Sequence, residues 1–524
     1  MNYKNKTLLL IFIATVVRCT IACCIELGND EVYYRMYAQY LQWNYFDHPP
    51  MVGWLIRFTT ANLLLDHEFF IRLGAIMAAA ITTWFIFLSG KTLNNAYCGF
   101  LAAVMYTFGI YGSIIAGTFI LPDSPQMACW SAALYLLIRI AGYSHINRTK
   151  KRDLLLFGLV AGLGMLCKIH TVFLWFGLLL YIIRHNRQWL KQPALYFSAI
   201  ITVALFYPVI QWNIDNHFIT YLYHSKRVAV TGSTINISSF AGFMGGQVLY
   251  FNPIIFILAA IATVAAFKNS LPVSLSQKRM LLYCSLPLIA FATAISLFRN
   301  VLPHWTGPAF TGLILLAACW LTKPALHSGR QILKPRFEKK LMPKTLMAAL
   351  VFQLLVITGG MLLVNYMPGS MGSKENTRLG DGDFTLDMYG WKMLATQFKK
   401  VTRSDEQAGT MKKDAFIIGS KWFPASHIDY YVAMPLQKEM IAIGDTNDIH
   451  QYAWINRERK KIKQGDDAYC IVPSNNYSDV KMQYAAYFDT IQLSQVIEQK
   501  RNGKNCRYFY IWQLKNFSAK QNPR

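Results

Sequence analysis

Carboxylates and a histidine gather in one polar stretch, residues 26–54, which follows the first apolar run of the chain. Asp30 and Glu31 stand near its start, and Asp47 and His48 precede two prolines. Connections between helices usually hold about 4–6 residues, and longer ones are often functional. The prolines restrict the backbone around them, so they present the second polar pair rigidly. We therefore predict that this stretch is a catalytic loop.

Asp30 could act as a general base on a reacting hydroxyl, or as the group that orients that hydroxyl. The alternative is that Asp30 and Glu31 cap the following helix, because acids favour helix N-termini; for Glu31 we favour that capping role. Asp123, in an outward Pro-Asp-Ser-Pro turn, is either a helix cap or a second catalytic carboxylate. His48 is either a phosphate contact or a structural anchor of its loop, with Asp47 as support. The outer carboxylates could also hold a divalent metal, although no cofactor is required by the pattern.

The elements that carry these residues are apolar helices. Of 524 residues, 54% are hydrophobic and only 15% are charged. Such a composition predicts a polytopic α-helical membrane protein. A net charge of +25 would also suit a nucleic-acid-binding protein. The cations lie in short loops between apolar runs, however, as the positive-inside rule requires, so we expect membrane lipids and no nucleic acid as partners.

About eleven membrane spans are expected, judged by run lengths near 17–25 residues. They cover residues 7–25, 70–88, 100–116, 126–141, 154–167, 171–183, 194–210, 241–267, 280–297, 309–321 and 346–364. The loops expected inside are rich in Lys and Arg, at residues 148–152, 184–191, 268–279 and 323–344. This alternation predicts a transmembrane domain over residues 1–366 with a cytoplasmic N-terminus and a first outer loop at 26–69.

From residue 367 the composition changes. Glycine and charged residues become more frequent, and no apolar run is long enough to span a membrane. Strands are expected at 415–419, 428–432, 468–472 and 507–514, and helices at 389–400 and 449–459. Strands that alternate with helices predict a small extracytoplasmic α/β domain over residues 367–524. Cys470 and Cys506 lie in or beside expected strands, so a disulfide between them is an open alternative.

Several cations are expected on the same outer side as the acids. These are Lys168, Arg227, Arg299 and His304. Charges at a membrane interface tend to be functional, and arginine can clamp a phosphate with two parallel hydrogen bonds. The alternative is ordinary contact with lipid headgroups. We predict that these side chains, with His48, bind a phosphate group, and that Arg227 and Arg299 lead the set.

Six motifs occur along the chain in a fixed order. They are Asn29-Asp30-Glu31, residues 45–51 (YFDHPPM), residues 121–125 (LPDSP), residues 246–253, Pro303-His304-Trp305 and Tyr389-Gly390-Trp391. Together they resemble bacterial members of glycosyltransferase family 39, the protein mannosyltransferases and lipid A aminoarabinose transferases with the GT-C membrane fold. Asp30 resembles the catalytic aspartate of that family. Where many relatives have Glu-Lys before the double proline, this chain has Asp47-His48.

The resemblance implies a polyprenyl-phosphate-linked sugar as donor and a protein, lipid A or other glycan as acceptor. Transfer, usually with inversion, would take place on the periplasmic side of a bacterial inner membrane, with the C-terminal domain on that side too. The sugar, hexosyl or pentosyl, is left open. The alternative is a lipid or sugar transporter or flippase without transferase activity. Such proteins usually carry internal repeats with polar groups near the midplane. We detect no repeat, so we favour the enzyme.

Overall fold

The computed structural model describes residues 2–142, 145–229, 234–323 and 342–518. Contacts within the chain divide it into two units. Unit 1 comprises residues 1–23 and 41–356, and unit 2 comprises residues 24–40 and 357–524. Most of the basic loop expected at 323–344 lies outside the described residues. The predicted domain boundary at 366/367 remains a prediction.

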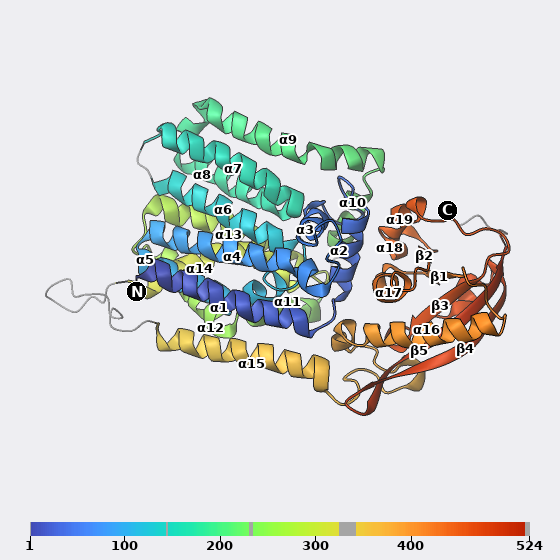
Figure 1. The fold of residues 1–524 in the computed structure, drawn as a ribbon. Helices are drawn as coiled ribbons and strands as arrows, with labels where there is room; N and C mark the ends of the chain where they lie inside the picture. Colours follow the sequence, from blue (N-terminus) through green and yellow to red (C-terminus); the bar gives the residue numbers. More distant parts are fainter. Residues whose placement is uncertain (1, 143–144, 230–233, 324–341, 519–524) are drawn as a thin grey trace. The chain divides into compact units, whose positions relative to one another are not determined.

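Unit 1 is helical (Figure 1). Its helices are α1 (Tyr3–Cys24), α3 (Met51–Thr59), α4 (Glu68–Leu93), α5 (Ala96–Phe108), α6 (Asp123–Gly142), α7 (Arg148–Cys167), α8 (Val172–His185), α9 (Pro193–Asp215), α10 (Ile219–Val228), α11 (Ile237–Tyr250), α12 (Pro253–Phe267), α13 (Leu275–Ser296), α14 (Gly307–Leu321) and α15 (Lys344–Tyr366). Shorter turns lie at Tyr111–Ile115, Ile169–Thr171, Arg187–Lys191 and Pro303–Thr306. Helix α1 ends at the border with unit 2, and α15 continues into it.

Six helical segments in the described part of the chain are long and apolar enough to cross a membrane. They are α1, α4, α9, α13, Pro303–Leu321 and α15. The pair α11 and α12 makes a seventh if it is one span, although the two helices are bent by 100°. The run expected as a single span at 241–267 is therefore broken. Helix α5 and residues Ile169–His185 are apolar but shorter.

Asn252 explains the bend between α11 and α12. Its φ of 65° is left-handed, a conformation that Asn tolerates better than most residues, and Pro253 begins the next helix. The Asn252 amide donates to the carbonyls of Phe108 (3.1 Å) and Ala349 (2.9 Å). A buried polar group is costly unless it is hydrogen-bonded, so these bonds hold the break in place inside the helical unit.

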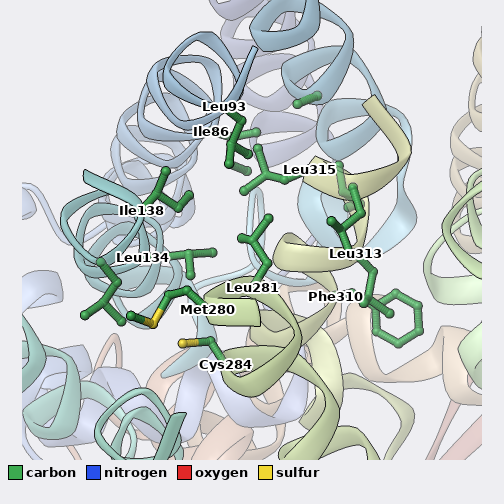
Figure 2. Packing of buried hydrophobic residues seen from close by; sticks show 14 of the residues in the cluster. Ile86, Leu93, Leu134, Ile138, Met280, Leu281, Cys284, Phe310, Leu313 and Leu315 are labelled. Carbon is green, nitrogen blue, oxygen red and sulfur yellow. The ribbon is translucent and has the colours of Figure 1, made fainter. Parts of the chain in front are cut away.

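The apolar core of unit 1 lies where α4, α6, α13 and α14 pack together (Figure 2). Ile86 of α4, Leu134 of α6, Leu281 of α13 and Leu315 of α14 point toward one another there and are each at most 1% exposed. Helices of a membrane bundle gain stability from close packing rather than from exclusion of water. This core holds the helix ends on which the polar residues described below are carried.

Unit 2 combines α2 (Asn29–Gln39) with the C-terminal part of the chain. Its sheet has the order β2-β1-β3-β5-β4, with β2, β1 and β3 parallel and β5 and β4 antiparallel (Figure 1). The strands are β1 (Phe416–Gly419), β2 (Met440–Ala442), β3 (Ala468–Pro473), β4 (Phe488–Arg501) and β5 (Lys504–Phe517). The helices are α16 (Trp391–Gln407), α17 (Trp422–Ile428), α18 (Thr446–Ile449), α19 (Tyr452–Glu458) and α20 (Val480–Tyr484).

Three of the four expected strands are confirmed as β1, β3 and β5, and both expected helices as α16 and α19. The strand expected at 428–432 is wrong, because α17 ends at Ile428 and a helical turn follows over Asp429–Ala433. Its β-branched and aromatic residues favour a strand by local propensity, yet they are buried in a helical conformation. Buried Asp429 pairs with Arg459 at 2.7 Å and accepts a hydrogen bond from Tyr452 at 2.8 Å, so tertiary contacts override the local preference.

Cys470 and Cys506 are free thiols, so the disulfide left open above is absent. The reason is the register of the sheet. Cys470 lies opposite Trp512, six residues along β5 from Cys506. Six residues of strand span about 20 Å, well beyond the separation of Cα atoms that a disulfide can bridge.

Candidate active site

A buried ion pair is the centre of the polar residues in unit 1. Asp123 is the first residue of α6, and Lys168 directly follows α7. The Lys168 ammonium lies 2.8 Å from Asp123 Oδ2, and the two side chains are only 6% and 3% exposed. The Tyr111 hydroxyl donates to Asp123 Oδ1 at 3.2 Å. Burying two charges is tolerated only when they are paired and hydrogen-bonded, so these three residues form one structural group.

Four histidines surround this pair. They are His48, His170, His224 and His304. Each lies close enough to Lys168 for its charge to act on the ring. The His48 and His224 ring centroids are 5.9 Å apart, and those of His170 and Trp305 are 5.7 Å apart. The structure thus brings together residues from five different connections of the helical unit.

Burial sets the protonation of the two histidines that lie outside the membrane-spanning helices. Burial, followed by the nearby charges of His224 and Lys168, lowers the pKa of His48 well below its usual value. Burial also lowers the pKa of His224. Its Nε2 lies 2.7 Å from the Asp47 carbonyl, which can only accept, so the neutral ring donates from Nε2 and leaves Nδ1 as an acceptor. Both rings are therefore neutral near pH 7 and act as hydrogen-bonding groups rather than cations.

Arg227, near the end of α10, is the cation of this cluster that solvent reaches most freely. Its guanidinium lies over the rings of Tyr223 (5.6 Å) and Trp305 (5.9 Å), and its charge acts on His48, His224 and His304. Stacked on two rings, the planar fork is preorganised for a phosphate.

Arg299 has a different set of contacts from Arg227. Its Nε donates to the Ala229 carbonyl at 3.0 Å, and its own carbonyl accepts from Ser239 at 2.6 Å. Arg299 therefore ties the end of α13 to the residues before and within α11. These bonds give Arg299 a structural role.

The loop that carries Asp47 and His48 is fixed to α10. Asn44 donates to the Thr220 hydroxyl at 2.9 Å, and that hydroxyl donates to the Tyr45 carbonyl at 2.9 Å. The loop also closes on itself through a bond from Tyr45 N to the His48 carbonyl, at 3.0 Å. The double proline then leads into α3. Rigid presentation of His48, predicted from the prolines, thus has additional polar support.

The turn with His304 depends on close approach of backbones. Gln247 of α11 donates to the Pro303 carbonyl at 2.7 Å. A Cβ added at Gly246 would lie 2.2 Å from Pro303 Cγ, and one at Gly307 would lie 2.0 Å from the Tyr111 ring. Both positions therefore require glycine for steric reasons. Substitution at either would shift the turn that carries His304.

Asp30 and Glu31 lie in unit 2, at the start of α2. Glu31 accepts a hydrogen bond from Gly28 N at 2.9 Å and so caps the helix, as we favoured from the sequence. Asp30, in the same first turn, is exposed. The capping bond is made by Glu31 and not by Asp30.

Residues more than 350 positions later in the chain hold α2 in place. Leu27 N donates to the Tyr431 hydroxyl (2.8 Å), the Tyr33 hydroxyl accepts from Gln451 N (3.1 Å), and Arg459 donates to the Tyr40 hydroxyl (2.8 Å). The helix is thus bound at its start, middle and end. The C-terminal part of unit 2 therefore positions the turn that carries Asp30.

Further carboxylates lie near Asp30 within unit 2. Asp387 is hydrogen-bonded to the Asn29 side chain and is close enough to Asp30 for the two charges to repel. Burial, opposed by the charge of Arg507, raises the pKa of Asp387 to about 7. Glu26 accepts from Trp391 N (2.8 Å) and Lys392 N (3.1 Å) at the start of α16, and burial raises its pKa as well.

The predicted site residues fall into two groups. Unit 1 gathers His48, Asp123, Lys168, Arg227 and His304, whereas Asp30 and Glu31 belong to unit 2. Sequence reasoning missed His170, His224 and Asp387, although two of them lie within three residues of a predicted one. In the described part of the chain, no group of three or more His, Cys, Asp and Glu side chains is arranged to hold a metal ion.

Comparison with known proteins gives matches of three kinds. Residues 47–212 match the family model described as dolichyl-phosphate-mannose-protein mannosyltransferase. The lipid A galacturonosyltransferase RgtD of Rhizobium johnstonii is 24% identical over 299 residues, which are 56% of this chain. The chain spans 60% of the length of that curated relative.

Solved structures of ArnT from Cupriavidus metallidurans match over nearly the whole chain. The apo structure gives a TM-score of 0.60 at 13% identity and covers 97% of this chain and 98% of ArnT. The structure bound to undecaprenyl phosphate gives 0.60 at 12% identity and 99% coverage of both chains. The resemblance predicted from the motifs is confirmed. The chain is a multi-pass helical membrane protein with a GT-C-like fold and a small C-terminal sheet.

Proposed function

We propose that the protein is a membrane glycosyltransferase that takes a sugar from a polyprenyl-phosphate-linked donor. The observation that carries this proposal is the cluster of Lys168, Arg227 and four histidines around the Asp123 carboxylate. A departing lipid phosphate needs cations and hydrogen-bond donors fixed before the reaction, and these groups are of that kind. The structural match to ArnT bound to undecaprenyl phosphate gives independent support.

The reaction we propose is a substitution at the anomeric carbon of the sugar. An acceptor hydroxyl gives its proton to Asp30 while its oxygen forms the new bond to that carbon. The bond from carbon to the phosphate oxygen breaks, and the electron pair leaves with the polyprenyl phosphate. Lys168 and Arg227 stabilise the resulting charge, and His48 and His304 supply hydrogen bonds. Asp123 is assigned to holding Lys168 rather than to taking the proton, because its carboxylate is already paired.

The membrane topology indicated by the loop charges is also a proposal: about eleven spans, a cytoplasmic N-terminus and a periplasmic C-terminal domain in a bacterial inner membrane. A reporter fused after Arg524 should then be active only outside the cytoplasm. One inserted near Arg336, which lies outside the described residues, should be active only inside. Activity of both on the same side would contradict the proposed orientation.

The acceptor is the least constrained part of the proposal. Protein, lipid A and another envelope glycan all present hydroxyls that Asp30 could deprotonate. Mass spectrometry of envelope glycans and glycoproteins, from cells with the intact chain and with Asp30→Asn, would identify it. A sugar that is present only with the intact chain supports the transferase. Identical envelopes together with a measured lipid flux would favour the transporter alternative.

A further inference from the structure

A cavity lies far from the residues described above. It has a volume of about 780 Å³ and is formed where α12 ends and α13 begins. Gln277 of α13 donates to the Ile138 carbonyl at 3.3 Å, close to the end of α6, whereas Asp123 is the first residue of α6. A helix of this length extends about 30 Å. The cavity and the Asp123 cluster therefore lie toward opposite ends of the same helical unit.

The wall that α13 contributes is polar at one end and apolar along the rest. Lys278, Leu282, Leu286 and Ala290 line the cavity at intervals of four residues. Arg279, Tyr283 and Pro287 form a neighbouring row with the same spacing. Residues four apart lie on one face of a helix, one turn above another. Each row thus begins with a cation and continues with less polar side chains for about 12 Å or more.

The cationic end is held by neutral partners. Lys278, 6% exposed, donates to the Asn269 side chain. Arg279 is hydrogen-bonded to His185 Nδ1 at 3.2 Å, and His185 Nε2 is hydrogen-bonded to the Tyr283 hydroxyl at 3.0 Å. Among the described residues that line the cavity, none is Asp or Glu. Two positive charges therefore face this space without an acidic residue in its wall, and an anionic ligand would complement them.

We propose that this cavity binds an anionic phospholipid of the surrounding membrane leaflet. Its phosphate would lie between Lys278 and Arg279, and one acyl chain would follow Leu282, Leu286 and Ala290. Basic pockets between membrane helices bind acidic headgroups in this way. A lipid would contact both the cationic end and the apolar side chains of the wall, whereas inorganic phosphate would contact only the cationic end. The site is separate from the donor site proposed above and does not depend on it.

The test uses the full chain in detergent, titrated with phosphatidylglycerol and with phosphatidylcholine and observed by native mass spectrometry. We expect phosphatidylglycerol to bind more tightly. The double variant Lys278→Gln/Arg279→Gln should lose roughly tenfold or more in that affinity. The matched control is Arg187→Gln/Lys191→Gln, which removes the same charge from the nearby turn between α8 and α9 but does not line the cavity. The control should bind as the unmodified chain does.

A second variant tests the apolar half and does not alter a charge. Ala290→Trp would fill the end of the cavity, and it should weaken binding of long-chain phosphatidylglycerol more than that of a dihexanoyl analogue. The proposal is overturned if both lipids bind equally to the unmodified chain, if the two double variants lose affinity equally, or if inorganic phosphate displaces the lipid at equal concentration. Thermal unfolding of each variant shows that any loss reflects the site rather than the fold.

Discussion

The surroundings of Asp123 and those of Asp30 differ in the balance of their charges. Around Asp123, in unit 1, lie Lys168, Arg227 and four histidines. Around Asp30, in unit 2, Glu26 and Asp387 add further carboxylates, with buried Arg507 as a counter-charge. The first set is suited to hold an anion. The second favours protonated carboxyl groups, because the pKa values of Glu26 and Asp387 are raised.

In the proposed reaction, the two halves of a glycosyl transfer need opposite electrostatics. A leaving phosphate requires fixed positive charge and hydrogen-bond donors, and a base requires an environment in which accepting a proton is favourable. Our proposal gives the first task to unit 1 and the second to the start of α2. Substitutions in each unit test that proposal.

The largest expected effect is that of Asp30→Asn. Removing a general base typically costs on the order of 10²–10⁴-fold in rate. Asn keeps the size of Asp, and the capping bond of α2 is made by Glu31, so the melting temperature should not change. Single-turnover transfer by the purified chain measures the loss, with exposed Asp448→Asn of the same unit as the control. A loss of less than about tenfold at unchanged stability would demote Asp30.

Next in size is the effect of Lys168→Ala on stability. The substitution leaves the Asp123 carboxylate buried without its cation, which typically costs about 3–5 kcal/mol. Adding Asp123→Asn should restore most of the loss, because the unpaired charge is then gone. Thermal unfolding in detergent compares the single and double variants with exposed Lys151→Ala. Equal destabilisation by the single and the double variant would mean that the ion pair is not the cause.

Arg227→Lys should weaken donor binding by roughly tenfold, or about 1.4 kcal/mol, because lysine keeps the charge but loses the planar fork. Arg299→Lys is the matched comparison in the same unit. Its guanidinium bonds the Ala229 carbonyl, so we expect a smaller change in donor affinity there. Titration with a polyprenyl-phosphate sugar separates the two. A larger loss at Arg299 would reverse their roles.

The smallest effect is on the pH dependence of stability. Asp387 has a pKa of about 7 in the folded chain against an ordinary 3.8, so between these values the folded state holds a proton that the unfolded state has released. Stability from this group is therefore lost as the pH rises toward about 7. Asp387→Asn should remove that loss and raise the melting temperature by a few degrees at pH 8 relative to pH 5.5. An equal shift at both pH values would contradict the raised pKa.

Local patterns indicated candidate site residues but not how those residues lie together. The double proline after His48 and the turn before Asp123 were informative because proline and acidic residues have strong local preferences. The pairing of Asp123 with Lys168 was not predictable, since 45 residues separate them and nothing local connects them. The same holds for α2, whose fixation by Tyr431 and Arg459 depends on contacts across the whole chain.

For the fold too, the sequence predicted local elements better than contacts between distant residues. Apolar runs predicted the helices, but the bend at Asn252 depends on acceptors in α5 and α15 that sequence spacing does not reveal. In unit 2, the predicted strand at 428–432 failed because the burial of Asp429 against Arg459 outweighs β propensity. The two hairpin strands β4 and β5 extend for 14 residues each, and only part of β5 was expected.

The most direct test of the central proposal is a single turnover by the unmodified chain with a labelled polyprenyl-phosphate sugar and bacterial envelope acceptors. We expect the label to appear on a lipid, glycan or protein acceptor, with release of one polyprenyl phosphate for each sugar transferred. The same donor, placed in vesicles with the protein, should not cross the bilayer faster than in protein-free vesicles. Label that stays on its donor lipid while that lipid crosses the bilayer would contradict the account and identify a flippase.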